Sequence, residues 1–377
     1  MIILIILLFT NCMKKQLIFS MLFIGSSLCA ANPFSGSMKK GDVEKVCNAV
    51  AKWQIVNHEQ VKHNQLDWTN GTLYRGMTEW GKTSGNQDCY NFVNEIGEKH
   101  NWNVWDRVYH ADDICVGQAF IEMYRKMGDR RMLQPTLERA FYVASHPSKA
   151  PLLKIDAIGK DERWSWSDAL FMAPPVYAAL YQITGEKIYL DYMDSEYKAC
   201  VDSLYDKEEH LFYRDCKRIP LREKNGKKQF WGRGNGWVFG GLPLIIDNLP
   251  IGCASRNYYI SLFVEMAESV KATQCKGGDW RTSLLDPDSY DMPENSCSAF
   301  MCYGIAWGIR NGYLPKKTYG KVLEKGWRSL VSAVHADGKL GYIQPVGAAP
   351  KAAGYDATDV YGVGAFLLVG SEIIKGL

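Results

Sequence analysis

The spacing of apolar residues constrains the fold of this chain more than any other feature of its sequence. Apolar side chains recur mostly at intervals of three and four residues, the period of an α-helix, and the two-residue alternation of strands is nearly absent. We therefore predict an all-α fold. The expected helices, about twelve in number, lie at Val43–Asn57, Leu73–Lys82, Tyr90–Lys99, Asp113–Met127, Arg130–Ala144, Asp168–Thr184, Lys187–Ser203, Asn235–Asp247, Arg256–Thr273, Ser296–Asn311, Pro315–Val334 and Ala357–Gly370.

Short turns that contain glycine join several of these helices. Gly128 and Gly185 each lie in such a turn, and turns this short make the helices on either side antiparallel. Because longer connections alternate with the short ones, six helical hairpins can close into a ring of inner and outer helices, with the long connections at one end. No Pro/Ser-rich linker interrupts the chain, so we predict one domain over residues 32–377.

The first 31 residues have the character of a secretory signal peptide. Met13 and two lysines precede an apolar run over residues 16–28, and Cys29 with two alanines then offers small residues for cleavage before Asn32. Met13 is therefore a candidate for the true start. The apolar run is short for a membrane span, which favours export, to the periplasm, over a stable membrane anchor.

Composition excludes several classes of function. The formal net charge is only +3, and no basic run or stripe indicates a nucleic-acid partner. Nine cysteines follow residue 31, an odd number set inside apolar helical patterns, which predicts small buried hydrophobes rather than a disulfide framework. The chain lacks the Cys-x-x-Cys, His-Glu-x-x-His and EF-hand spacings, so we expect neither a metal nor a cofactor.

The most informative motif is Trp-Ser-Trp-Ser-Asp at Trp164–Asp168, which places a carboxylate beside indole rings and before an apolar helix. A helix N-terminus lowers the pKa of a carboxyl group, whereas aromatic walls and a second nearby acid raise it. A general acid needs the raised pKa, because it must still carry its proton near neutral pH. Asp168 is therefore either a general acid or a helix N-cap beside two core tryptophans.

A second acidic cluster, His110-Ala-Asp112-Asp113, precedes the next predicted helix. Either acid can cap that helix. Alternatively, acids at the starts of helices in one ring face the same end, and Asp112 with Asp168 then forms the carboxylate pair that acid–base work on a glycoside requires. His110 is the only imidazole beside a candidate acid.

A third cluster, Phe230–Trp237, combines two tryptophans, an arginine, an asparagine and three glycines. Glycine permits close backbone approach, and the fork of Arg233 matches a carboxylate. Arg214, in the preceding Leu211–Asp215 segment, is a second candidate for a substrate carboxylate. The alternatives are a Gly-rich turn capped by Asn235 with tryptophans in the core, and ordinary ion pairs for the arginines.

Later motifs carry less chemistry. Trp280 is a candidate wall of a sugar subsite, Ser296 is expected to be a helix N-cap, and Glu294 is expected to be solvated. The chain has no Gly-x-Ser-x-Gly motif and no Cys/His or triad spacing, so nothing supports nucleophilic catalysis.

Taken together, these motifs resemble glycoside hydrolase family 105, the unsaturated rhamnogalacturonyl hydrolases. The resemblance extends from about Gly41 to the C-terminus, and the set in this order is more specific than any one block. The shared blocks are His110–Ile114 with Gly117, Trp166–Met172, Leu211–Asp215, Trp231–Trp237 and the last predicted helix.

The resemblance implies an (α/α)6 barrel of six helical hairpins and a hydrolysis that needs no metal. Substrates in that family are oligosaccharides left by polysaccharide lyases, which end in a 4,5-unsaturated uronic acid. An acid protonates C4 of the vinyl ether and water adds at C5. The resulting hemiketal opens and releases the next sugar.

The family pattern also implies roles for single residues. By position, Asp168 matches the proton donor and Asp112 its partner carboxylate. Arg214 stands where some members carry a histidine, so it can grip the uronate carboxylate or select a different uronate epimer. The expected substrate-binding residues are His110, Asp113, Trp166, Met172, Arg214, Trp231, Arg233 and Trp237.

Three other functions fit the same residues. The neighbouring family of unsaturated glucuronyl hydrolases shares the fold and the chemistry but acts on glycosaminoglycan-type fragments. A non-catalytic oligosaccharide-binding protein can use the same acids and tryptophans as ligands. The third alternative is an ordinary six-hairpin hydrolase or lyase. Such a hydrolase needs two carboxylates on either side of an anomeric carbon, whereas a lyase needs a Tyr or Lys base. The configuration of the uronate, the next sugar and the oligomeric state stay open.

Overall fold

A computed structural model describes residues 32–153 and 161–377 of the chain. These residues are mostly helical, and two short strands, β1 (Tyr205–Asp206) and β2 (Leu211–Phe212), pair antiparallel. The α-helices are α1 (Lys40–Val56), α2 (Trp68–Ser84), α3 (Gln87–Lys99), α4 (Gly117–Met127), α5 (Gln134–Ser145), α6 (Ala169–Met172), α7 (Pro174–Thr184), α8 (Lys187–Leu204), α9 (Gly232–Ile246), α10 (Ala254–Ala272), α11 (Asn295–Arg310), α12 (Lys316–Ser332) and α13 (Val360–Lys375). Short 3-10 helices are η1 (His58–Gln60), η2 (Ala111–Ile114), η3 (Arg130–Met132), η4 (Cys216–Arg218) and η5 (Pro287–Ser289). Every helix expected from periodicity is confirmed, with ends that differ by a few residues.

Two kinds of helix alternate along the chain. The first kind, here called the inner helices, is buried over most of its residues and comprises α2, α4, α7, α9, α11 and α13. The outer helices bury one stripe and expose the rest, and comprise α1, α3, α5, α8, α10 and α12. A one-sided apolar stripe packs on a single layer, whereas an apolar helix such as α9 needs neighbours on every side.

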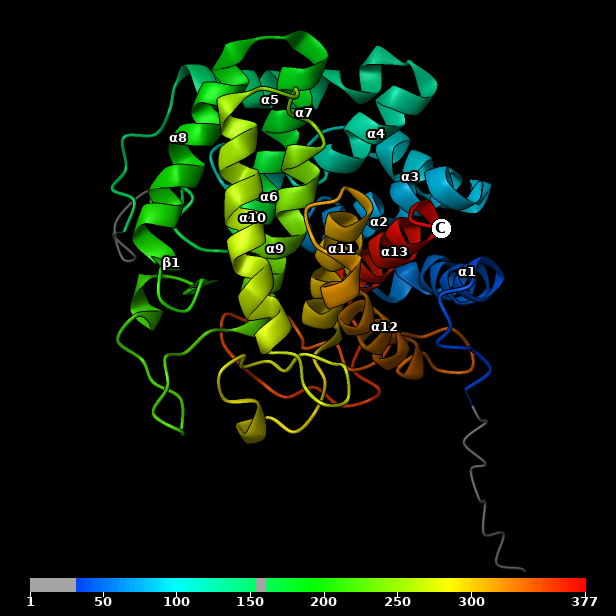
Figure 1. Cartoon of the computed structure of the whole chain (residues 1–377). Coiled ribbons are helices and arrows are strands. Elements are labelled where there is room, and N and C mark those ends of the chain that lie inside the picture. Colours follow the sequence, from blue (N-terminus) through cyan, green and yellow to red (C-terminus); the bar gives the residue numbers. More distant parts are fainter. Residues whose placement is uncertain (1–31, 154–160) are drawn as a thin grey trace, which may run out of the picture. The chain divides into compact units, whose positions relative to one another are not determined.

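The inner helices form a closed ring. Contacts run from α2 to α4, α7, α9, α11 and α13 in turn, and α13 returns to α2. Figure 1 shows the connections from β1 to α9, from α10 to α11 and from α12 to α13 gathered at one end, below the helices. The expected (α/α)6 barrel is therefore confirmed for the described residues.

Glycine closes the ring where its first and last inner helices meet. A Cβ atom added to Gly76 in α2 would overlap the backbone of Gly364 in α13, and one added to Gly364 would overlap the carbonyl of Thr72. The two helix backbones therefore touch directly, which only residues without a side chain permit.

The adjacent prolines Pro174 and Pro175 break the expected Asp168 helix into α6 and α7. A proline lacks the N–H that a helix needs at its interior positions, so carbonyl groups one turn earlier lose their donors. The Gln118 amide of α4 replaces them, since its Nε2 donates to the carbonyls of Phe171 at 2.8 Å and Met172 at 3.1 Å. The main helix of this segment, α7, therefore begins at Pro174.

The predicted signal peptide, residues 1–31, lies outside the described residues. Among the helices of the described part, none combines the length and the apolar character needed to cross a bilayer. All nine cysteines of this part are free thiols, and the prediction of small buried hydrophobes is confirmed for Cys47, Cys89, Cys115, Cys200, Cys297 and Cys302. The others are half-buried.

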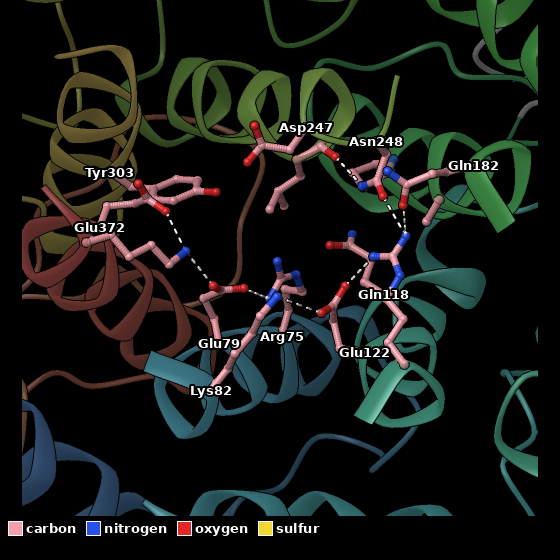
Figure 2. A pocket seen from close by; sticks show the side chains of 15 residues that line it. Arg75, Glu79, Lys82, Gln118, Glu122, Gln182, Asp247, Asn248, Tyr303 and Glu372 are labelled. Carbon is pink, nitrogen blue, oxygen red and sulfur yellow. Dashed lines mark hydrogen bonds and ion pairs between the residues drawn. The ribbon is translucent and has the colours of Figure 1, made fainter. Parts of the chain in front are cut away.

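A polar cavity of about 320 Å³ lies at the carboxyl-terminal ends of the inner helices, all of which line it. Figure 2 shows its charged side chains joined into chains of ion pairs. Glu79 accepts from Arg75 Nη1 at 2.7 Å and from Lys375 Nζ at 2.5 Å, and Lys375 also donates to Glu372 at 2.8 Å. Burial alone raises the pKa of Glu79, but Arg75 and Lys375 outweigh it and bring the pKa below its ordinary value.

Candidate active site

Asp112 and Asp168 lie at the amino-terminal ends of the inner helices, at the opposite end from this cavity. Asp112 belongs to η2, just before α4, and Asp168 immediately precedes α6. Their side chains are 16% and 12% exposed. The fold brings the two acids close enough for the charge of Asp168 to raise the pKa of Asp112.

Neither acid caps a helix. Asp168 makes no side-chain capping bond to α6, and its Oδ2 instead accepts the Ser167 hydroxyl at 3.1 Å. In η2 the capping group is His110, whose Nδ1 accepts the N–H of Asp112 at 3.3 Å. The N-cap interpretation is therefore wrong for both acids, and their carboxyl groups are left for other partners.

The two carboxyl groups have raised pKa values for partly different reasons. Burial, and then the neighbouring Asp168, raise the pKa of Asp112 well above its ordinary value. Burial also raises the pKa of Asp168, while the guanidinium groups of Arg214 and Arg233 partly oppose it. The site therefore favours a retained proton on the pair, which a general acid requires.

A short backbone pairing places Arg214 beside Asp168. Trp166 forms an antiparallel bridge with Asp215, and the N–H of Ser167 donates to the Arg214 carbonyl at 2.9 Å. The Arg214 Nε then lies 3.6 Å from Asp168 Oδ2, and its Nη1 donates to Asp215 Oδ2 at 2.9 Å. The Arg214 side chain is 27% exposed, so it remains within reach of a ligand.

Asn235 fixes the segment that carries Arg214. It lies inside α9 and is fully buried, and its amide accepts from the N–H of Phe212 at 2.7 Å and donates to the carbonyl of Phe212 at 3.0 Å. The alternative interpretation, in which Asn235 caps a Gly-rich turn, is therefore wrong, because α9 begins earlier, at Gly232. Sequence reasoning missed this positioning role, since the partner is distant along the chain.

Asp113 and His110 flank the acid pair. The Asp113 carboxylate accepts the backbone N–H of Arg107 at 2.8 Å and the Arg107 Nη2 at 2.6 Å, so this acid holds the loop before η2. His110 packs on Trp166 with ring centroids 5.0 Å apart. Burial, and then Arg107, lower the pKa of His110 to about 4, so its imidazole is neutral near pH 7.

Arg233 is fully buried between two aromatic rings. Its guanidinium carbon lies 4.5 Å from the ring centre of Trp231 and 4.9 Å from that of Tyr361. It donates to the Gln344 carbonyl at 2.5 Å and to the Tyr361 hydroxyl. Arg233 therefore holds the loop after α12 against α9. Its charge lowers the pKa of Asp168 without a direct contact.

Gln344 is a buried residue that the sequence did not identify. Its Oε1 accepts from Trp231 Nε1 at 3.0 Å and from Thr282 Oγ1 at 2.8 Å, and its N–H donates to Glu294 at 3.0 Å. Position 232 requires glycine, because a Cβ atom there would overlap the Arg281 carbonyl. Three distant loops are thereby joined beside Trp231.

The remaining predicted binding residues are mostly buried. Trp166 is 6% exposed and contacts His110 beside the acid pair, whereas Met172, Trp231 and Trp237 are buried at 2% exposure or less and offer no surface to a sugar. Trp237 instead supports Trp68, whose ring meets it edge-on at 5.6 Å. Trp68, at the start of α2, is half-buried and was not identified from the sequence.

Three interpretations of later motifs are wrong. Glu294, not Ser296, caps α11, because its carboxylate accepts the N–H of Cys297 at 2.8 Å and is buried rather than solvated. Trp280 is fully buried, and its Nε1 donates to the Val270 carbonyl at 2.8 Å, so it belongs to the core and does not line a subsite.

The cluster therefore offers two acids whose side chains are at most 16% exposed, a partly exposed guanidinium and a neutral imidazole. Within residues 32–153 and 161–377, no group of His, Cys, Asp and Glu side chains is arranged to hold a metal ion. The chemistry that these groups supply themselves is proton transfer beside a bound anion.

Comparisons with known proteins agree with this chemistry. The family model of Glycosyl Hydrolase Family 88 matches residues 43–377. An unsaturated 3S-rhamnoglycuronyl hydrolase from Formosa agariphila is 36% identical over 366 residues, which cover 93% of this chain and 96% of that protein. A protein with the same name from Alteromonas is 35% identical over 352 residues and covers 88% and 85%.

A solved structure described as glycosyl hydrolase family 88 from Bacteroides vulgatus is similar in fold. Its TM-score is 0.80 at 30% sequence identity, and the match covers 90% of this chain and all of that one (100%). The likeness extends over the whole ring of helices.

Proposed function

The chain belongs to glycosyl hydrolase family 88, and on that premise we propose that this glycosidase removes a terminal 4,5-unsaturated uronic acid from oligosaccharides produced by polysaccharide lyases. The observation that carries the proposal is the buried pair Asp112 and Asp168, with raised pKa values, beside Arg214. The names of two relatives over most of the chain point to the same substrate class.

The reaction adds one water molecule and breaks one glycosidic bond. Asp168 gives its proton to C4 of the C4=C5 double bond, and positive charge develops at C5 and the ring oxygen. Water adds at C5, and the carboxylate of Asp168 takes back a proton from it. The hemiketal then opens to a 5-keto sugar, which leaves a hemiacetal at C1 that releases the next sugar.

Asp168 is proposed as the donor because the Ser167 hydroxyl and Arg214 fix its position while burial holds its pKa up. Asp112 is proposed as the partner that orients sugar hydroxyl groups and keeps one proton on the pair, since two nearby carboxylates resist double ionisation. Neutral His110 can donate or accept a hydrogen bond without adding charge.

Arg214 is proposed to bind the uronate carboxylate. In the unliganded site its charge acts on Asp168, 3.6 Å away, and lowers the pKa of that acid. A substrate carboxylate that takes over the guanidinium weakens this effect, so the pKa of Asp168 rises as substrate binds. Binding and protonation of the donor are then coupled.

We further propose that the uronate is followed by rhamnose with a sulfate at its 3-position, as the names of the two relatives suggest. The narrower assignment to family 105 also belongs to this proposal. It rests on the motif set from His110 to Trp237, whereas the family model that matches is that of family 88. Export to the periplasm through cleavage of residues 1–31 is a proposal from sequence alone.

Ultraviolet absorbance tests the proposal, because the conjugated uronate absorbs and its hydration product does not. The purified protein is incubated with lyase digests of pectin, of glycosaminoglycans and of a sulfated rhamnose–uronate polysaccharide. We expect loss of signal, fastest with the sulfated rhamnose digest. A folded protein that removes the signal from none of them would overturn the proposal and favour a non-catalytic oligosaccharide-binding protein.

A further inference from the structure

A second pocket lies at the catalytic end of the ring, on the outer side of α13. Its volume is about 450 Å³, within the size range of ligand sites. The C-terminal end of α1, the loop that leads to α2, and the residues around the start of α13 form its walls. The lining of this pocket includes none of the residues Asp112, Asp168, Arg214 and Arg233.

The first turn of α13 separates this pocket from the acid cluster. Val360 lines the pocket, and the next residue, Tyr361, packs at a tilt against Trp68 and accepts a hydrogen bond from Arg233. Consecutive Cα atoms are about 3.8 Å apart, so one turn of α13 separates the pocket from the Arg233 side chain. An oligosaccharide long enough to pass over this turn would reach both the acids and the pocket.

The charge of the pocket suits an anion. Lys62 and Lys339 both line it, and neither side chain makes an ion pair within the described residues 32–153 and 161–377. The carboxylate that lines the pocket, Asp359, is already bound to His63 at 3.0 Å. That contact raises the pKa of His63, which adds to the positive character of the pocket.

Two other side chains give the pocket the features of a sugar site. Gln54 is only 2% exposed, yet its side-chain amide lines the pocket and has no hydrogen-bond partner among the described residues. Its amide atoms are not among the fully buried polar atoms without a partner, so they remain accessible from the pocket and can bond a sugar hydroxyl there. Trp53 adds an aromatic face, and its Nε1 donates to Asp337 at 3.0 Å, which fixes the ring.

We propose that this pocket is a distal subsite that binds an acidic sugar unit of the same oligosaccharide, beyond the bond that is cleaved. Lys62 and Lys339 pair with its sulfate or carboxylate, Gln54 bonds a hydroxyl and Trp53 packs on the ring. The inference rests on the proposed function, and it predicts that longer substrates bind more tightly than the unsaturated disaccharide.

Chain length of the substrate provides the test. Initial rates are measured on an unsaturated disaccharide and an unsaturated tetrasaccharide from one lyase digest of a sulfated rhamnose–uronate polysaccharide. For the wild-type protein we expect a lower KM with the tetrasaccharide. The double variant Lys62→Ala/Lys339→Ala should raise the tetrasaccharide KM by about tenfold and leave the disaccharide KM within about twofold.

Controls separate this proposal from the proposed function. Lys52→Ala, an exposed lysine of α1 outside the pocket, should change neither KM. If a desulfated tetrasaccharide no longer has a lower KM than the disaccharide, sulfate is the group that the pocket binds. If its KM stays lower, the bound group is the carboxylate. Equal wild-type KM values for both lengths, or an equal rise for both in the double variant, would overturn the subsite. Failure on both substrates would instead overturn the proposed function.

Discussion

At the amino-terminal ends of the inner helices, Asp112 and Asp168 are buried and have raised pKa values. At the carboxyl-terminal ends, Glu79 is buried as well, yet its pKa is lowered. Burial opposes the charged form in all three cases, so burial does not explain the difference. The difference lies in the partners, because Glu79 accepts from two cations at short distance and Asp112 has none as close.

Helix dipoles add to the contrast. The carboxyl-terminal ends of long helices favour cations, and α4, α11 and α13 place Arg125, Arg310 and Lys375 in their last turns. At the other end, Asp112 lies within η2 and Asp168 precedes α6, and these short segments carry little dipole to stabilise a carboxylate. One end of the ring thus pairs its buried acid with cations, whereas the other end leaves its acids with raised pKa values.

Replacement of Asp168 by Asn should give the largest effect. The amide keeps the shape of the side chain but cannot donate the proton, so kcat should fall by about 10³-fold or more. The absorbance assay measures the rate, and far-ultraviolet circular dichroism should show an unchanged helical spectrum. Substantial remaining activity in a folded variant would remove Asp168 from the proposed role.

Glu79→Gln should give the opposite pattern, with lost stability and a nearly unchanged kcat. Breaking the buried contacts to Arg75 and Lys375 should lower the free energy of unfolding by about 3 kcal/mol. Urea denaturation at pH 7 measures it.

The pH dependence and a matched control sharpen this prediction. A lowered pKa stabilises the folded state above the unfolded pKa of Glu, and this contribution disappears as the pH falls through the folded pKa. The deficit of the variant should therefore shrink below about pH 4. Glu324→Gln, which breaks an exposed ion pair with Arg328, should cost less than about 0.5 kcal/mol.

Arg214→Gln should raise the KM of the unsaturated disaccharide about tenfold or more, because a charged hydrogen bond to the uronate is lost. Since Arg214 lowers the pKa of Asp168 in the free enzyme, its loss should also move the alkaline limb of the kcat/KM profile to higher pH. Arg222→Gln, an exposed arginine, is the control and should change neither. A purely structural role for Arg214 would leave the position of the pH limb where it is.

Asp112→Asn should give the smallest change in stability. Unlike Glu79→Gln, it should stabilise the fold. A raised pKa means that the folded state holds its proton more tightly, so the wild-type protein loses stability as the pH rises above the unfolded pKa. The neutral amide avoids this loss and should stabilise the fold by about 1 kcal/mol at pH 8, with little gain at pH 4. Thermal unfolding at both pH values measures it, and an equal effect at both would contradict a raised pKa.

The sequence pointed to the two acids of the proposed site, and the reason is local. Asp168 and Asp112 stand beside aromatic residues at the start of apolar segments, and such neighbours lie a few residues away in the chain. By contrast, Gln344 is hydrogen-bonded to Trp231 and Asn235 to Phe212. Gln54 lines a pocket together with residues at the start of α13. These partners are brought together only by ring closure, so no spacing in the sequence reports them.

The sequence by itself determined the set of helices, the ring that their short and long connections allow, and the two acids, because helical period and turn length are local properties. Only the tertiary structure decided which polar groups are satisfied. It made Glu294 a buried cap, turned Arg233 into a brace for the loop after α12, and put Trp280 in the core. Burial and partnership depend on contacts between distant segments, and these set whether a carboxyl group holds a proton or an ion pair.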